Sequence, residues 1–255
     1  DECVLENIDD DGTPVEPKVY ATTISMLPIN GAIGIGAGSS TYIPQYNPKD
    51  VIKNTRLLIQ GKEPVPMVPH YKGFKGKVVM TNDKSFETHG IYEIIDENTI
   101  IIEELPVGTW TEPYKEILDN LTADDPNKPI KGELFKKVID DCGNNTIKFT
   151  LIFLDGALQE LVKKNEIMKR LQLVNKHSLT NMNAYNANGT IQKYDSILSI
   201  LIEHYKFKLD MYVKRKNYYL KILENKLKVL EWKIKFIEYI VNGKIVVFEN
   251  KEARS

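Results

Sequence analysis

The chain has 255 residues, 42% of them hydrophobic, which is enough to build a core in one large domain or two smaller ones. Its 34 basic side chains nearly balance 35 acidic ones, which excludes a strongly positive field over the whole protein, so any basic surface must be local. The basic side chains are 30 lysines and only 4 arginines. Lysine is a point charge suited to phosphates, so we expect little reading of base edges.

The cysteine and histidine content argues against a metal centre. Cys3 and Cys142 form no CxxC pair, which indicates reduced thiols and no structural zinc. The four histidines have no spacing that puts two of them on one helical face. No run approaches about 18 apolar residues, and the acidic start has no signal-peptide character, so we expect a soluble intracellular protein without membrane contact. A start without Met and the ending KEARS are typical of a segment excised from a longer chain.

The first elements surround a glycine-rich stretch. Apolar and polar residues alternate from Lys18 to Leu27 and predict a strand, which leads into an exposed loop at Gly31 to Gly38. Asn47 then supplies an N-cap and Pro48 the first helical position, and apolar residues at helical spacing predict a helix that ends at Gly61.

The middle region, residues 62 to 194, mixes strands and helices. The segments KVVM, GIYEII, NTIIIEEL and TIKFTLIFL predict strands. Helices are expected from Thr111 through Leu121 and from Asp155 toward Leu171, and Asn188-Gly189 predicts a two-residue hairpin turn. The expected fold class is therefore α+β, with an antiparallel sheet flanked by helices.

The last region predicts one long helix. Asp195 can cap a helix without Gly or Pro to about Ile240, which at about 1.5 Å per residue extends on the order of 65 Å. Its apolar residues step by three and four, the spacing of a coiled-coil seam, which Ile202, Leu209 and Val213 extend upstream. The seam consists of Leu220, Leu223, Leu227, Leu230, Ile234 and Ile237. The strand-like KIVVF follows, so the partner helix must come from outside this segment or from another protomer.

The glycine-rich stretch could cradle a phosphate with its backbone amides. However, no Gly-Lys-Ser/Thr follows, and Gly34, Gly36 and Gly38 do not have the spacing of a dinucleotide fingerprint. A nucleotide site is therefore disfavoured. Ile35 stands out as an apolar residue between glycines, and taken alone it is interpreted as packing inward.

Six blocks carry a family resemblance: VEPKVY, LPINGAIGIG, GSSTYIPQYNPKDVI, MVPHYKGFKG, IIEELPVGTWTEPYK and KYDSILSIL. In sequence, order and spacing they resemble the region of eukaryotic and large-DNA-virus type IIA DNA topoisomerases that follows the catalytic winged helix. The resemblance covers nearly the whole chain. It implies that residues 1–46 hold the end of the winged-helix region with a DNA-bending wedge loop, 47–194 the tower domain, and 195–255 the outgoing coiled-coil helix toward the exit gate.

The resemblance also implies two DNA contacts. Ile35 takes the position of the isoleucine that wedges between base pairs, at a cost of about a few kcal/mol offset by further contacts. Ile33, Ala37 and Ser39 depart from the usual residues, an acid, Thr and Trp, so local packing here is expected to differ. The second contact is the segment formed by Gln172, Leu173, Val174, Asn175, Lys176, His177, Ser178, Leu179, Thr180 and Asn181. Without the resemblance this segment is interpreted as a polar strand on a solvated face.

The family cuts DNA by attack of a Tyr hydroxyl on phosphorus, assisted by an adjacent Arg and a metal-bearing acidic domain. No Arg in this chain precedes a Tyr, so we expect no catalytic residue, no metal and no bound cofactor here, and an inactive segment. The parent enzyme is expected to be a homodimer that joins through the coiled coil and exit gate, acts on duplex DNA, and uses Mg²⁺ and ATP. Its expected location is the nucleus, or the host cytoplasm if viral.

Two functions from other classes remain as alternatives. One is a structural coiled-coil scaffold without a DNA role, which needs the seam but not Ile35. The other is a nucleotide-binding enzyme that uses the glycine-rich stretch, and it requires ATP or NAD to raise the melting temperature.

Overall fold

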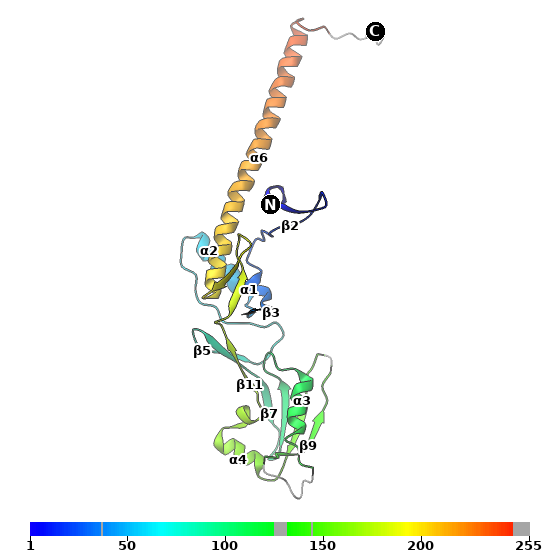
Figure 1. The fold of residues 1–255 in the computed structure, drawn as a ribbon, viewed down its shortest axis with the longest axis vertical. Helices are drawn as coiled ribbons and strands as arrows, with labels where there is room; N and C mark the ends of the chain where they lie inside the picture. The colour runs from blue at the N-terminus through cyan, green and yellow to red at the C-terminus, as the bar shows by residue number, and fades with distance from the viewer. Residues whose placement is uncertain (37, 125–131, 144, 247–255) are drawn as a thin grey trace, which may run out of the picture. The chain divides into compact units, whose positions relative to one another are not determined.

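The computed structural model describes residues 1–36, 38–124, 132–143 and 145–246. The chain divides into two compact units, one formed by Asp1–Thr23 with Glu203–Ser255 and the other by Ile24–Ile202 (Figure 1).

The unit Ile24–Ile202 contains a four-stranded antiparallel sheet in the order β7-β8-β10-β9. Its strands are β7 (Ile91–Ile94), β8 (Thr99–Glu104), β10 (Phe149–Phe153) and β9 (Phe135–Asp140). Three helices accompany it, α3 (Thr111–Asp119), α4 (Ala157–Lys164) and α5 (Ile167–Arg170). Alternate residues of β10 are buried, since one face of the strand points into the core.

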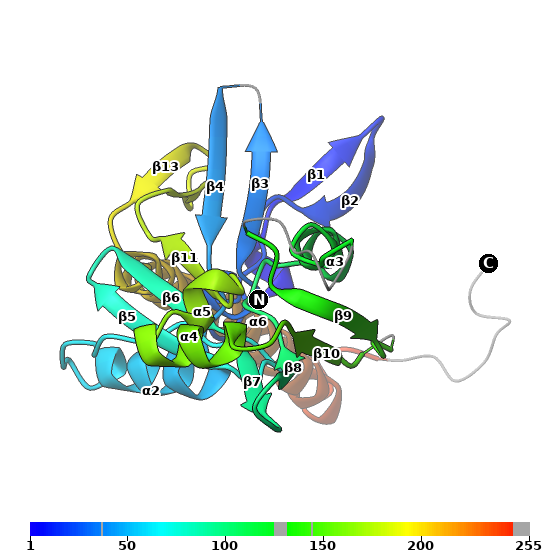
Figure 2. The same ribbon diagram turned by 90° about the horizontal axis from the view of Figure 1, so that it is seen from below.

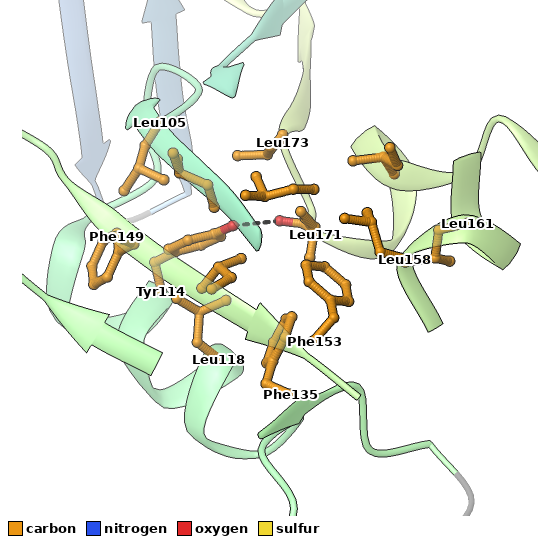
Figure 3. Packing of buried hydrophobic residues seen from close by; sticks show 14 residues of the cluster. Leu105, Tyr114, Leu118, Phe135, Phe149, Phe153, Leu158, Leu161, Leu171 and Leu173 are labelled. Carbon is orange, nitrogen blue, oxygen red and sulfur yellow. Dashed lines mark hydrogen bonds between the residues drawn. The ribbon is translucent and has the colours of Figure 1, made fainter. Parts of the chain in front are cut away.

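This sheet and its helices enclose an aromatic and aliphatic core (Figure 3). Phe135 and Phe153 pack edge to face with ring centroids 4.9 Å apart. Tyr114 on α3 is fully buried, and its hydroxyl donates a 2.7 Å hydrogen bond to the carbonyl of Leu171. The hydroxyl therefore ties α3 to the chain beyond α5 inside the core.

Three smaller sheets and a second core complete this unit. The three-stranded sheet has the order β11-β6-β5, and β3 pairs with β4 and β12 with β13, all antiparallel. The strands are β11 (Val174–Ser178), β6 (Ser85–His89), β5 (Lys77–Asn82), β3 (Ala32–Gly36), β4 (Ser39–Ile43), β12 (Met182–Tyr185) and β13 (Ile191–Tyr194). The helices are α1 (Leu27–Asn30) and α2 (Pro48–Ile59). Ile43, Phe86 and Met182 bring β4, β6 and β12 into one buried cluster.

The other unit joins the N-terminal segment to most of α6 (Ile197–Val241). The segment comprises η1 (Glu2–Val4) and the hairpin β1 (Asn7–Asp10) with β2 (Thr13–Pro17). The Lys208 ammonium pairs with Asp1 and donates a 2.7 Å bond to the carbonyl of Ala21. Arg215 lies 3.0 Å from the same aspartate, so one carboxylate gathers two cations of the helix.

Several predicted elements are confirmed. The side chain of Asn47 accepts a 2.9 Å bond from the amide of Lys49 at the start of α2. Strands β5, β7, β8 and β10 and helix α3 lie where their patterns placed them. The predicted hairpin joins β12 to β13, although residues 186–190 rather than two residues connect the strands. Helix α6 runs without interruption for 45 residues.

Other predictions are wrong. Residues 18–27 form no strand, and the last of them, Leu27, begins α1. The loop expected over Gly31 to Gly38 is mostly strand β3. The single helix expected from Asp155 is split into α4 and α5, because Asn165 adopts a left-handed conformation with φ of 53°. Residues 244–246 form no strand, and the rest of KIVVF lies outside the described residues. The proposed boundaries at 46 and 194 stay predictions.

The buried Tyr114 hydroxyl provides a test of the first core. We predict that Tyr114→Phe lowers the free energy of unfolding by about 1–3 kcal/mol, because it leaves the carbonyl of Leu171 without its partner. Urea unfolding measures the change. Tyr185→Phe is the control, since Tyr185 is 72% exposed and water replaces its hydroxyl contacts. Equal stability of the two variants would contradict this account.

Candidate nucleic-acid interface

Strands β3 and β4 form an antiparallel hairpin (Figure 2), and this hairpin presents apolar side chains to solvent. Because successive side chains of a strand alternate between its faces, Ile33 and Ile35 lie on one face of β3. The other face carries Ala32, Gly34 and Gly36, and is nearly bare. Ile33 is 80% exposed and Ile35 is 95% exposed. Ile35 therefore does not pack inward in this chain, contrary to the interpretation from composition and spacing alone.

Gly31 fixes the point at which α1 ends and β3 begins. Its φ is +68°, and a Cβ there would lie 2.8 Å from the carbonyl oxygen of Ile43 and 3.0 Å from the side chain of Gln45. Both the left-handed backbone and the close approach of β4 require glycine. Any other residue at position 31 would strain the backbone where the hairpin begins.

Strand β12 holds β4 along its free edge. The amide of Tyr42 donates to the carbonyl of Asn181 at 2.8 Å, and the Thr41 hydroxyl donates to the carbonyl of Asn183 at 2.7 Å. The Asn183 amide side chain donates in turn to the carbonyl of Ser40 at 2.7 Å, and Asn181 donates to the Ser40 hydroxyl at 2.7 Å. These bonds anchor the hairpin through β4 and leave β3 free to face outward.

An apolar groove of about 500 Å³ lies beside the hairpin. Residues of β3 and β4 line one side, and Ala184, Tyr185 and Ile191 of the β12–β13 hairpin line the other. Tyr185 and Ile191 are also largely exposed.

The predicted contact segment, residues 172–181, runs through β11 and divides into two sets of side chains. Leu173 and Leu179 are buried in the two cores, so their side chains cannot contact a ligand. Val174 is partly buried, and Asn175 donates a 2.8 Å bond to the carbonyl of Val107. The remaining side chains include four exposed ones, on Gln172, Lys176, Ser178 and Thr180.

His177 is partly buried, and its ring is held by neighbouring side chains. Its Nδ1 lies 2.9 Å from the Tyr42 hydroxyl and its Nε2 lies 3.0 Å from the Thr88 hydroxyl, so both ring nitrogens have partners. The ring packs on Phe86 with centroids 4.7 Å apart and planes 17° apart. Sequence reasoning did not identify this arrangement, because Tyr42 and His177 are separated by 135 positions and no local pattern links them.

Lys176 is the exposed cation of the segment. Its ammonium lies 3.5 Å from a carboxylate oxygen of Glu87, on the neighbouring strand β6, and its side chain is 81% exposed. A hydrogen bond from His89 and the charge of Lys176 hold the pKa of Glu87 below its usual value. An exposed pair of this length is weak, so the ammonium can exchange Glu87 for a phosphate.

The coiled-coil seam of α6 is exposed in this chain. Leu223, Leu227 and Ile237 are 58% to 59% exposed, and the remaining seam residues are 45% to 57% exposed. Six apolar side chains in one row on a single helix leave a surface that a second helix can cover.

The described residues contain no group of three or more His, Cys, Asp or Glu side chains that could hold a metal ion. Likewise, no helix in the described part of the chain is long and apolar enough to cross a membrane. The glycines of β3 pair with β4 and do not precede a helix N-terminus with free amides, which removes the main support for a phosphate cradle.

Two partly buried histidines predict a pH dependence of stability. Burial lowers the pKa values of His177 and His204 below the ordinary value of 6.5. As the pH falls below about 6.5, the unfolded chain therefore binds more protons than the folded one, and the free energy of unfolding decreases. Urea unfolding between about pH 7.5 and pH 5.5 measures the slope, which His177→Gln should reduce. An unchanged slope in this variant would show that His177 does not contribute.

The sequence matches known proteins along nearly its whole length. The family model for the A subunit of DNA gyrase/topoisomerase IV matches residues 1–254. DNA topoisomerase 2 of Acanthamoeba polyphaga mimivirus is 33% identical over 98% of this chain and 24% of the relative. DNA topoisomerase 2 of Pisum sativum is 36% identical over 99% of this chain and 17% of the relative. The chain therefore spans a quarter or less of the length of these relatives.

A solved structure agrees with this match. The crystal structure of the Plasmodium falciparum topoisomerase II DNA-binding, cleavage and re-ligation domain superposes with a TM-score of 0.81 at 35% identity, and the match covers 98% of this chain and 33% of that one. The family match over all but the last residue, together with this shared fold, shows that the chain belongs to the type II DNA topoisomerase family.

Proposed function

We propose that this chain binds and bends duplex DNA and helps to form the gate in an ATP-dependent type II DNA topoisomerase, which passes one duplex through a transient break in another. The observation that carries the proposal is Ile35, an apolar side chain 95% exposed to water on a hairpin that hydrogen bonds hold along its β4 edge. Such a side chain can enter a base step from the minor groove, at a cost of about a few kcal/mol that the contacts of a bent duplex offset.

The glycines on either side of Ile35 suit this role. Gly34 and Gly36 carry no side chain, so the strand can approach the sugar-phosphate backbone closely. Ile33, two residues away on the same face, adds a second apolar contact beside the wedge. The apolar hairpin thus offers a narrow insertion element rather than a broad docking face.

The exposed residues of the 172–181 segment supply contacts to the DNA backbone. Lys176 contacts a phosphate in place of Glu87, and the hydroxyls of Ser178 and Thr180 and the amide of Gln172 offer hydrogen bonds. The buried or internally bonded members of the segment hold these groups in position. Because lysine dominates the cations, the contacts fix the protein on the duplex without reading its sequence.

Other regions of the enzyme carry out the cleavage. No Arg-Tyr pair occurs in this chain, and its described residues do not fit a Mg²⁺ site, so we place the nucleophile, the metal-binding acidic domain and the ATPase elsewhere in the parent enzyme. Within it, residues 1–46 carry the wedge, 47–194 the tower and 195–255 the helix toward the exit gate. We propose that the parent is a homodimer in the nucleus, or in the host cytoplasm if viral.

Bending of a short duplex tests the wedge. We predict that Ile35→Ala in the complete enzyme reduces bending, measured by energy transfer between dyes at the two ends of the duplex. The change removes three carbon groups worth about 0.8 kcal/mol each when buried in a base step. Affinity at fixed salt should change less, because phosphate contacts dominate it.

Ile59→Ala is the matched control, since Ile59 is an exposed isoleucine of α2, 66% accessible, and the change removes the same atoms away from the hairpin. Bending should match that of the unmodified enzyme. The wedge assignment is wrong if Ile35→Ala bends DNA as strongly as this control.

The seam of α6 supports a coiled coil with a helix outside the described residues. We predict that Leu227→Ala lowers the stability of the complete enzyme by about 1.5–3 kcal/mol, because a seam leucine is buried against its partner. Lys228→Ala, one position along and off the seam, should change stability by less than about 0.5 kcal/mol. Thermal unfolding compares the two, and equal small effects would mean that no helix covers the seam.

A further inference from the structure

A hydrogen-bonded cluster connects the wedge hairpin to the three-stranded sheet. The Tyr42 hydroxyl of β4 lies 2.9 Å from His177 Nδ1 on β11 and 3.1 Å from the Tyr71 hydroxyl. On the far side of the imidazole, Nε2 lies 3.0 Å from the hydroxyl of Thr88 on β6. The four side chains come from four separate segments, so the cluster ties together stretches of the chain that share no backbone pairing with the hairpin.

The imidazole at the centre of this cluster is fixed in orientation. His177 stands opposite Phe86 in the β11–β6 register, and the two rings pack at 4.7 Å. Its plane lies within 8° of the Tyr42 ring. Thr88 and Phe86 are fully buried, so the side of the ring that faces the sheet cannot shift without opening the core. An imidazole with both nitrogens bonded has one allowed orientation, whereas an apolar side chain of similar volume would have several.

Tyr42 transmits this constraint to the wedge. In the hairpin register Tyr42 stands directly opposite Ile33, and Ile35 stands opposite Ser40, two residues along β4. The bonds from β12 hold one edge of β4, and the buried side chain of Ile43 holds its end. The Tyr42 side chain supplies a further attachment, to a different sheet. Attachments in different directions restrict the tilt of the hairpin.

We propose that Tyr42, His177 and Thr88 are positioning residues that set the angle of the β3–β4 hairpin relative to the β11-β6-β5 sheet, and thereby aim Ile35. Exposed Ile35 has almost no packing of its own, so its direction depends on the strand that carries it. A wedge that enters a base step must be held within a fraction of an ångström and a few tens of degrees. The effect on DNA rests on the proposed function, but the anchoring of the hairpin does not.

Spin-label distances test the anchoring without DNA. Labels are attached at Ile33→Cys and Lys77→Cys, on β3 and β5, in a chain with Cys3 and Cys142 changed to Ser. Tyr42→Phe keeps the ring and removes only the hydroxyl, so the fold should survive while the distance distribution broadens by about twofold. Tyr114→Phe is the matched control, because it removes a hydroxyl bond in the other core. An unchanged width in Tyr42→Phe overturns the proposal.

Thr88 provides the second pair of variants. Thr88→Val removes the hydroxyl that faces His177 and keeps the side-chain shape, whereas Thr88→Ser keeps the hydroxyl and removes the methyl group. We expect Thr88→Val to broaden the same distance distribution and Thr88→Ser to leave it at the original width. If Thr88 acts only through its shape, Thr88→Ser should broaden the distribution and Thr88→Val should not. That result overturns the proposal.

DNA bending in the complete enzyme then measures the consequence for the wedge. We expect Tyr42→Phe to reduce end-to-end energy transfer toward the level of Ile35→Ala, with affinity at fixed salt changed by less than about twofold. If Ile35→Ala itself has no effect, the proposed function fails while the spin-label result still decides the anchoring. If only Ile35→Ala has an effect, the wedge stands and the positioning role is wrong.

Discussion

An apolar side chain that stays in water until its ligand arrives cannot be held by burial. Ile35, the proposed wedge, has 95% of its surface exposed, so the direction in which it points depends on the backbone of β3 and on the contacts that hold β4. The structure meets this constraint with hydrogen bonds. Thr41 and Asn183 fix β4 to β12, and Tyr42 extends a side chain to the three-stranded sheet. The core lies on the β4 side, where Ile43 is buried, and the working surface lies on β3.

The glycines of the β3–β4 hairpin have two different roles. On the bare face of β3, Gly34 has only the Thr41 methyl group within ordinary contact distance of a Cβ, so glycine is not needed there to avoid a clash. Gly31 is different, because both its left-handed φ and the nearby carbonyl of Ile43 exclude a side chain. In the proposed function the first kind of glycine leaves room for a duplex, whereas the second shapes the fold. The structure of the chain by itself explains why glycine is needed at Gly31, but not at Gly34.

Local chemistry predicted those elements whose signals lie within a few residues of one another, such as the Asn47-Pro48 start of α2 and the Asn188-Gly189 turn. It failed at β3, because glycines disfavour strands and only pairing with β4 makes this segment extended. Strands β6 and β9 escaped prediction since their sequences, SFETH and FKKVID, mix charged and apolar residues. The outward position of Ile35 followed from the family resemblance and not from spacing. The Tyr42–His177 contact could not be predicted, as its members lie 135 positions apart.

The seam of α6 and the β3–β4 hairpin are exposed apolar surfaces that differ in the kind of partner that fits them. The seam of α6 repeats at three and four residues over many turns, so it can be covered only by another long element with a matching repeat. The proposed wedge has two isoleucines and then glycine, which is too small an area to hold a protein partner but suits the proposed separation of a pair of stacked bases. A structural scaffold would need the seam of α6, but it would not need hydrogen bonds that hold the β3–β4 hairpin. The hydrogen bonds around Tyr42 and Asn183 therefore favour a hairpin that acts on DNA over one that merely connects two strands.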